Sequence, residues 1–250
     1  MAHHAEPLAT RIAGHAIRGA CRLAARRIDL RVEGLDHLPA SGPAIIAARH
    51  FHHFYDGCAL VAVVPRPLKI LVTLDWMKSA AGLRLMRGAC QIANWPVVVR
   101  SDAQGRHSGA TVDRRQLLQA TRECVDLLRA GQFVLVFPEG YPNIDPSFTP
   151  KTSDEAFLPF HPGFVRIAVL AERDGITRVP IVPVGLKYQR SDRWRVTVRF
   201  GRPVTHVPNG DFRVQVATIE EQVRRLSGLE RAAGSDERAR NETSIEVVLT

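Results

Sequence analysis

Apolar runs of strand length alternate along this chain with helical segments, and this alternation constrains the fold more than any other feature. One apolar run, PAIIAA, ends at Ala48, and another, QFVLVF, ends at Phe137. The helical segment before the second run extends from about Asp113 to Ala130 and closes at Gly131. Helices of this length act as crossovers between parallel strands, so we expect an α/β fold with a mainly parallel sheet flanked by helices.

The same patterns predict how the 250 residues are organised. We expect an N-terminal basic amphipathic helix in residues 1–30, one α/β domain in residues 31–230 and a C-terminal tail in residues 231–250. Further strands are predicted over 28–34, 68–74, 95–100, 177–188 and 194–204, and further helices over 56–64, 76–89, from 163 onward and over 212–229.

The protein has a formal net charge of +9, and several of its basic residues lie in the N-terminal segment. Apolar residues such as Leu8, Ile12 and Leu23 recur on one side of the predicted helix, and basic residues recur every three or four positions on the other. Such a helix suits an anionic membrane surface, and it could equally pack on the domain with a solvated arginine face. No recognisable nucleic-acid motif accompanies the charge. The basic positions are Arg11, His15, Arg18, Arg22 and Arg26.

Cysteine spacing and hydropathy predict the cellular location of the protein. The four cysteines lie far apart without a C-x-x-C pair, which argues against a zinc knuckle or a disulfide framework. No apolar stretch of about eighteen residues and no signal-peptide core is visible. We therefore expect a cytoplasmic protein, peripherally associated with the membrane and without a transmembrane segment. The cysteines are Cys21, Cys58, Cys90 and Cys124.

The segment RHFHHFYD places three histidines and an aspartate directly after a predicted strand. An imidazole oriented by Asp56 could act as a general base. Alternatively, His50, His52 and Asp56 could be metal ligands, as in a metal-dependent hydrolase. The segment could also be a solvated turn in which Asp56 caps a helix. The residues alone leave these interpretations open, and His53 is a third candidate base.

A carboxylate follows a second predicted strand in VFPEG, where Glu139 stands between Pro138 and Gly140. The carboxyl ends of parallel strands share one edge of a sheet, so Glu139 should lie near the histidine segment. A long stretch rich in proline and polar residues follows, up to the helix predicted near Gly163. Loops of this length inside a compact domain are typically functional or mobile.

Together these blocks resemble the glycerolipid or lysophospholipid acyltransferases, the PlsC-like family that includes 1-acylglycerol-3-phosphate acyltransferase. The matching segments are VEGLDHLPASGPAIIAARH with the following Asp56, GACQIANWPVVVR, FPEG, FHPGFVRIA and VPIVPVG. The resemblance extends from about Val32 to Val204, which is most of the chain.

The resemblance implies transfer of an acyl group from acyl-CoA or acyl-carrier protein to a lipid hydroxyl, with no cofactor, no metal and no nucleic acid. A histidine would be the base, with Asp56 as its partner. Glu139, Gly140 and Tyr141 would help to place the acceptor, and Arg100 would meet a negative head group with its planar fork. The implied partners are a lipid acceptor, an acyl thioester donor and an anionic membrane surface.

Two departures from the family pattern bear on the site. The family separates histidine and aspartate by four residues, whereas here five separate His50 from Asp56 and three separate His52 from Asp56. The strand lead-in favours His50 as the base, with Arg49 in place of the family's asparagine, whereas helical spacing favours His52 or His53. After FPEG, Tyr141 and Pro142 replace the usual threonine and arginine. A catalytically silent lipid-binding protein therefore stays a second alternative, and the head group, chain length and donor stay open.

Overall fold

The computed structural model describes residues 8–74, 79–98, 114–146, 148–205 and 211–229. A six-stranded sheet in the order β1-β8-β7-β2-β6-β3 forms its centre. Neighbouring strands run parallel except β7 and β8, which are antiparallel. Two short strands, β4 and β5, form a separate pair. The strands are β1 Asp29–Glu33, β2 Ala44–Ala48, β3 Leu68–Ile70, β4 Val72–Thr73, β5 Val97–Val98, β6 Phe133–Val136, β7 Ile181–Gln189 and β8 Arg195–Phe200.

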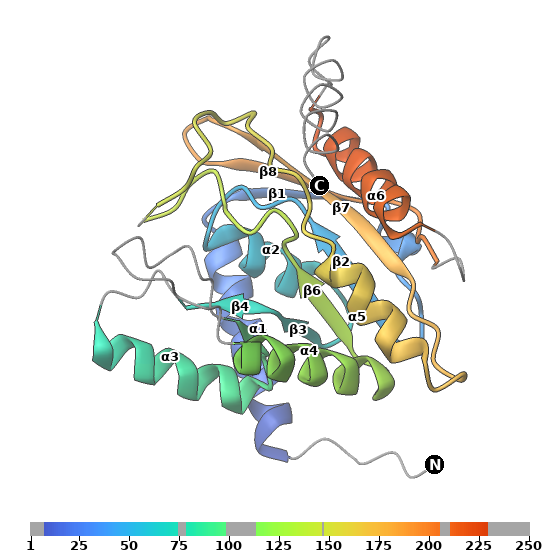
Figure 1. The fold of residues 1–250 in the computed structure, drawn as a ribbon. Helices are drawn as coiled ribbons and strands as arrows, with labels where there is room; N and C mark the ends of the chain where they lie inside the picture. Colours follow the sequence, from blue (N-terminus) through green and yellow to red (C-terminus); the bar gives the residue numbers. More distant parts are fainter. Residues whose placement is uncertain (1–7, 75–78, 99–113, 147, 206–210, 230–250) are drawn as a thin grey trace, which may run out of the picture.

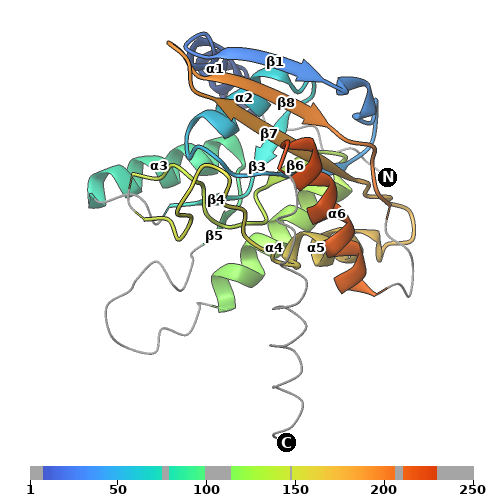
Figure 2. The same ribbon diagram turned by 90° about the horizontal axis from the view of Figure 1, so that it is seen from above.

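Helices cover both faces of this sheet (Figure 1 and Figure 2). Helices α1 and α2 pack together on one face, whereas α4, α5 and α6 lie on the other. The predicted α/β fold with a mainly parallel sheet flanked by helices is therefore confirmed. The helices are α1 Leu8–Ala25, α2 Tyr55–Val63, α3 Ala80–Ala93, α4 Arg114–Arg129, α5 Gly163–Glu172 and α6 Phe212–Leu226, with a short 3-10 helix at Leu35–His37.

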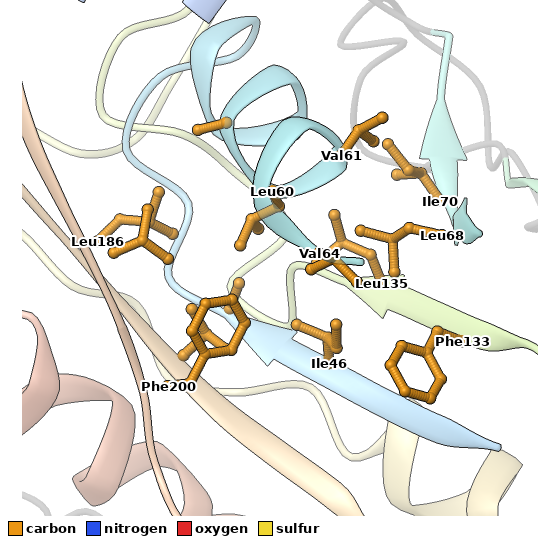
Figure 3. Close-up of a cluster of buried hydrophobic side chains, with 14 of the residues drawn as sticks. Ile46, Leu60, Val61, Val64, Leu68, Ile70, Phe133, Leu135, Leu186 and Phe200 are labelled. Atoms are coloured by element: carbon orange, nitrogen blue, oxygen red, sulfur yellow. The ribbon is translucent and has the colours of Figure 1, made fainter. Parts of the chain in front are cut away.

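Strand β2 shows why the apolar runs form central strands. All five of its residues are buried, because successive side chains point to opposite faces of the sheet and both faces are covered. Ile46 faces the cluster under α2, and Ile45 faces the cluster under α5 and α6. Figure 3 shows Leu60 and Val64 packed over β2 and β6 in the first of these clusters.

Some predicted boundaries differ from the structure. The run 68–74 is divided between the main sheet and the two-stranded sheet. The helix predicted over 76–89 is observed at Ala80–Ala93, because the Ser79 hydroxyl accepts a hydrogen bond from the Gly82 amide and Asn94 closes the helix in a left-handed conformation. The predicted tail in residues 231–250 lies outside the described residues.

Helix α1 packs on α2 through one face and exposes another. Cys21 and Ala25 are buried against the domain. The predicted apolar stripe points outward instead, and the side chains of Leu8, Ile12 and Leu23 are 59% to 70% exposed. No helix in the described part of the chain is both long enough and apolar enough to cross a membrane.

Candidate active site

Asp56 is the most heavily hydrogen-bonded side chain of the turn after β2. It lies in the first turn of α2 and is fully buried. Its Oδ2 accepts hydrogen bonds from His50 Nδ1 at 2.9 Å and from the backbone amides of Phe51 at 2.6 Å and His52 at 2.9 Å. Its Oδ1 accepts one from the Tyr188 hydroxyl at 2.6 Å. A carboxylate with this set of donors is held in a single orientation.

Two features of the surroundings favour this arrangement. The amino end of α2 is the positive end of the helix dipole, which stabilises a negative charge at Asp56. Burial, and secondarily the Asp56 charge, raises the pKa of the Tyr188 hydroxyl well above its ordinary value. Tyr188 therefore stays protonated and keeps donating to the carboxylate.

His50 is held by Asp56 on one side and by an aromatic ring on its face. The imidazole stacks on Phe137 with 4.1 Å between ring centroids and an interplanar angle of 15°. Its side chain is 14% exposed. Because the carboxylate accepts from Nδ1, the proton of the neutral ring resides on Nδ1 and Nε2 carries the lone pair.

The other two histidines turn elsewhere. His52 Nδ1 accepts hydrogen bonds from the backbone amides of Phe54 at 3.2 Å and Tyr55 at 3.4 Å, at the start of α2. Burial lowers the pKa of His52, although the Asp56 charge opposes this. The His53 ring is exposed and contacts the Ile144 carbonyl oxygen at 3.2 Å. Among the described residues, only His50 has an imidazole that meets the Asp56 carboxylate.

Glu139 connects the FPEG segment directly to the histidine turn, as the shared sheet edge predicted. Its Oε1 accepts a hydrogen bond from the His50 backbone amide at 2.8 Å, and its Oε2 accepts one from the Leu158 amide at 3.0 Å. The carboxylate is buried. Gly140 follows with φ of +76°, a left-handed conformation that glycine adopts without strain. Glu139 thus holds the backbone of His50 in place through a hydrogen bond to its amide.

Lys151 is a site residue that the sequence reasoning missed. It comes from the long segment after FPEG, its side chain is fully buried, and its Nζ lies 2.6 Å from Glu139 Oε2. The same ammonium donates to the His50 carbonyl oxygen at 2.7 Å and to Asn143 Oδ1 at 3.2 Å. Burial lowers the pKa of Lys151, and the Glu139 charge opposes that shift. No motif or periodicity of the sequence singles out Lys151 within this segment.

The segment after FPEG is fastened to the site at further points. Arg49 NH2 donates to the Asp154 carbonyl oxygen at 2.6 Å, and NH1 donates to the Leu186 carbonyl oxygen at 3.1 Å. Asn143 Nδ2 donates to the Ser153 carbonyl oxygen at 2.7 Å. Arg49, which stands where the family has asparagine, therefore joins β7 to this segment. These hydrogen bonds hold the segment in place beside the site in this structure.

Two further residues were predicted to belong to the site, Tyr141 and Arg100. Tyr141 is buried, and its ring meets Phe148 edge-on with centroids 5.9 Å apart. Arg100 lies outside the described residues. Within the described ranges, no three His, Cys, Asp or Glu side chains are arranged to hold a metal ion. His52 in particular offers its Nδ1 to backbone amides.

Comparisons with known proteins bear on the family and the fold of the chain. The family model described as Acyltransferase matches residues 29–187, which is more than half of the chain. A search of curated proteins finds no match. Among solved structures, the chain is similar to the 1-acyl-sn-glycerophosphate (LPA) acyltransferase PlsC from Thermotoga maritima, with 20% identity and a TM-score of 0.59. That match covers 90% of this chain and 83% of the other.

The family model spans both the histidine turn and the FPEG segment, and the structural likeness extends over nearly the whole described fold. The resemblance noted in the sequence motifs is confirmed at the level of family and fold. The chain belongs to the acyltransferase family, with the PlsC fold.

Proposed function

We propose that this enzyme transfers a fatty acyl group from an acyl thioester to the free hydroxyl of a lysophospholipid or related lipid alcohol, with His50 as the base. The observation that carries the proposal is the His50–Asp56 pair at the carboxyl edge of the sheet. It leaves the second ring nitrogen of His50, Nε2, without a hydrogen-bond partner among the described residues. The similar Thermotoga protein is a 1-acyl-sn-glycerophosphate (LPA) acyltransferase, which supports lysophosphatidic acid as the first candidate acceptor.

In this mechanism the acceptor hydroxyl gives its proton to His50 Nε2 as its oxygen attacks the thioester carbonyl carbon. Asp56 stabilises the imidazolium that forms and keeps the ring in place. The carbon–sulfur bond then breaks, and the leaving thiolate takes the proton from Nε2 to become a free thiol. The histidine is neutral again at the end, and no acyl-enzyme forms.

Glu139 and Lys151 serve this chemistry by fixing the main chain of His50. The Glu139 carboxylate holds the His50 amide, and the Lys151 ammonium holds the His50 carbonyl oxygen. With both backbone groups fixed and the ring stacked on Phe137, the imidazole has little freedom left to lose when the substrates bind.

The outward stripe of α1 supports a peripheral place on an anionic membrane surface. Leu8, Ile12 and Leu23 are exposed on one side of the helix, with Arg11 and Arg22 beside them. Apolar side chains that enter the lipid interface and flanking cations that meet anionic head groups are the two features of interfacial helices. The acceptor lipid would then reach the enzyme from the surface to which α1 binds.

Release of free thiol from acyl-CoA in the presence of a panel of lysophospholipids tests the proposal. The His50→Ala variant should lose about 10²- to 10⁴-fold in turnover, as is typical when a general base is removed. His53→Ala is the matched control, since it removes an exposed ring from the same turn, and it should stay within about threefold of wild type. Equal activity of wild type and His50→Ala would overturn the assignment of the base.

A further inference from the structure

A cavity of about 480 Å³ lies between α1, the carboxyl end of α2 and the start of β3. It is separate from the candidate active site. Asp56 is in the first turn of α2, whereas Val61 of its last turn lines the cavity. Leu68, which also lines it, pairs with the first residue of β6, and Glu139 follows the last. The cavity therefore lies near the amino ends of β3 and β6, whereas the candidate active site follows the carboxyl ends of the strands.

The walls of this cavity carry positive charge. Arg11, Arg18 and Arg22 of α1 and Lys69 of β3 line it, together with His15. None of the residues that line it within the described chain has a carboxylate side chain. Cations gathered in one concavity repel one another, and an anion placed among them removes that cost.

The arginines are not equivalent. Arg18 is committed to the fold, because its guanidinium donates to the carbonyl oxygens of Val64 at 2.9 Å and Arg66 at 2.6 Å at the end of α2. Burial and the nearby Arg22 charge lower the pKa of Arg18. Arg11 and Arg22 are exposed and make no hydrogen bond or ion pair with another residue that the structure describes. These two guanidinium groups are thus available to an anionic ligand.

Other walls of the cavity are apolar, and its rim adjoins the exposed stripe of α1. Ile17, Leu68 and Trp95 line it beside the cations. On α1, the cavity residue Arg11 stands three positions after the stripe residue Leu8, and the cavity residue His15 stands three positions after Ile12, so the two rows are adjacent on the helix surface. A ligand that fits both rows has a phosphate at one end and a hydrocarbon portion at the other.

We propose that this cavity binds the phosphate group of an anionic membrane lipid and thereby fixes how α1 sits on the bilayer. The inference rests on the membrane placement of α1 in the proposed function, and it adds a lipid site distinct from that of the acceptor. Two guanidinium forks suit a phosphodiester, because each fork can donate to two of its oxygens. The site would make binding depend on the head group as well as on the charge of the surface.

Calorimetric titration with dihexanoylphosphatidylglycerol, kept below its micelle-forming concentration, tests the site directly. Wild type should bind one equivalent, and Arg11→Gln/Arg22→Gln should bind at least tenfold more weakly. The matched control is Arg26→Gln/Arg27→Gln, which removes the same charge from exposed positions just past α1 that do not line the cavity. This control should bind as wild type does.

Three outcomes would overturn the proposal. Equal weakening in both double variants would mean that only the general positive charge attracts the lipid. Unchanged binding in Arg11→Gln/Arg22→Gln would place the ligand elsewhere, and inorganic phosphate binding as tightly as the lipid would make this a plain phosphate site. The thiol-release assay on wild type is independent of these titrations, so failure of the acyltransferase proposal and failure of the lipid site are distinguishable.

Discussion

The two ends of α2 lie beside charges of opposite sign, and these charges differ in whether they are paired within the protein. At the amino end, the buried Asp56 carboxylate accepts four hydrogen bonds from protein groups. At the carboxyl end, Arg18 caps the helix, while the neighbouring Arg11 and Arg22 face a cavity. Both charges suit the helix dipole. The difference shows that charges paired within the protein fix geometry, whereas charges left facing a cavity are available for a ligand.

Asp56→Asn tests the difference at the amino end of α2, where the charge is paired within the protein. The substitution keeps the size of the side chain but removes the charge that orients His50 and stabilises the imidazolium. Turnover in the thiol-release assay should fall by about 10²- to 10⁴-fold. Tyr188→Phe removes one donor and keeps the carboxylate, so it should lose only about tenfold. Near-normal turnover of a folded Asp56→Asn protein would contradict the role given to the carboxylate.

Lys151→Met tests how much a paired charge inside the protein contributes, because it leaves the buried Glu139 carboxylate without its cation. Without the ammonium, Glu139 is a buried carboxylate without its cation, and the free energy of unfolding should fall by about 3–5 kcal/mol. The double variant Lys151→Met/Glu139→Gln removes both charges and should recover much of that stability in a denaturant titration. Turnover should stay low in both variants, because the His50 carbonyl oxygen still lacks its donor. Recovery of turnover together with stability would make Lys151 a purely structural residue.

Ile12→Ser/Leu23→Ser separates the apolar stripe from the cations beside it. Both side chains are exposed, so the fold should be unaffected. Vesicle sedimentation should show at least about tenfold weaker binding, because burying one such side chain is worth about 1.5–3 kcal/mol. Ile176→Ser/Val214→Ser removes equally exposed side chains that belong to neither α1 nor α2, and it should bind as wild type does. Equal loss in both pairs would refute the assignment of α1 as the membrane surface.

His52→Asn tests the smallest effect, which concerns stability and pH. Burial holds the pKa of His52 below 6.5, so the unfolded chain binds the proton more readily than the folded protein. The free energy of unfolding should therefore fall as the pH drops below 6.5. Asparagine can accept the same helix-start hydrogen bonds without titrating, so the variant should lose less stability than wild type between pH 7.5 and 5.5. An identical loss would show that His52 does not contribute.

The sequence predicted the central sheet well because its strands are buried on both faces. A short, continuously apolar run such as Ala44–Ala48 is typical of a buried central strand. The polar segment that follows it therefore lies at the carboxyl ends of the strands. His50, Asp56 and Glu139 were therefore predicted to lie close together, and the structure brings them into one hydrogen-bonded cluster. Spacing alone could not choose among the three histidines, because an irregular turn has no fixed period.

The contributions of Lys151 and Arg49 could not be predicted in the same way. Their hydrogen bonds depend on how a segment without regular structure folds back across the sheet edge, and no periodicity in the sequence describes that path. The exposed stripe of α1 shows another limit. Amphipathicity predicted a helix there, but an Ala-rich helix can bury either of two faces, and only the packing on α2 decides which one.

The hydroxyl that reaches Asp56 Oδ1 belongs to Tyr188, which lies 132 positions later in the chain. During synthesis, residues 49–56 emerge from the ribosome long before the partners that hold them in place. A nascent chain ending before β7 would thus contain the base and its carboxylate without the Tyr188 hydroxyl and without the strand that pairs with β2. Catalytic competence would then arise late in translation, after the sheet has received its final central strand.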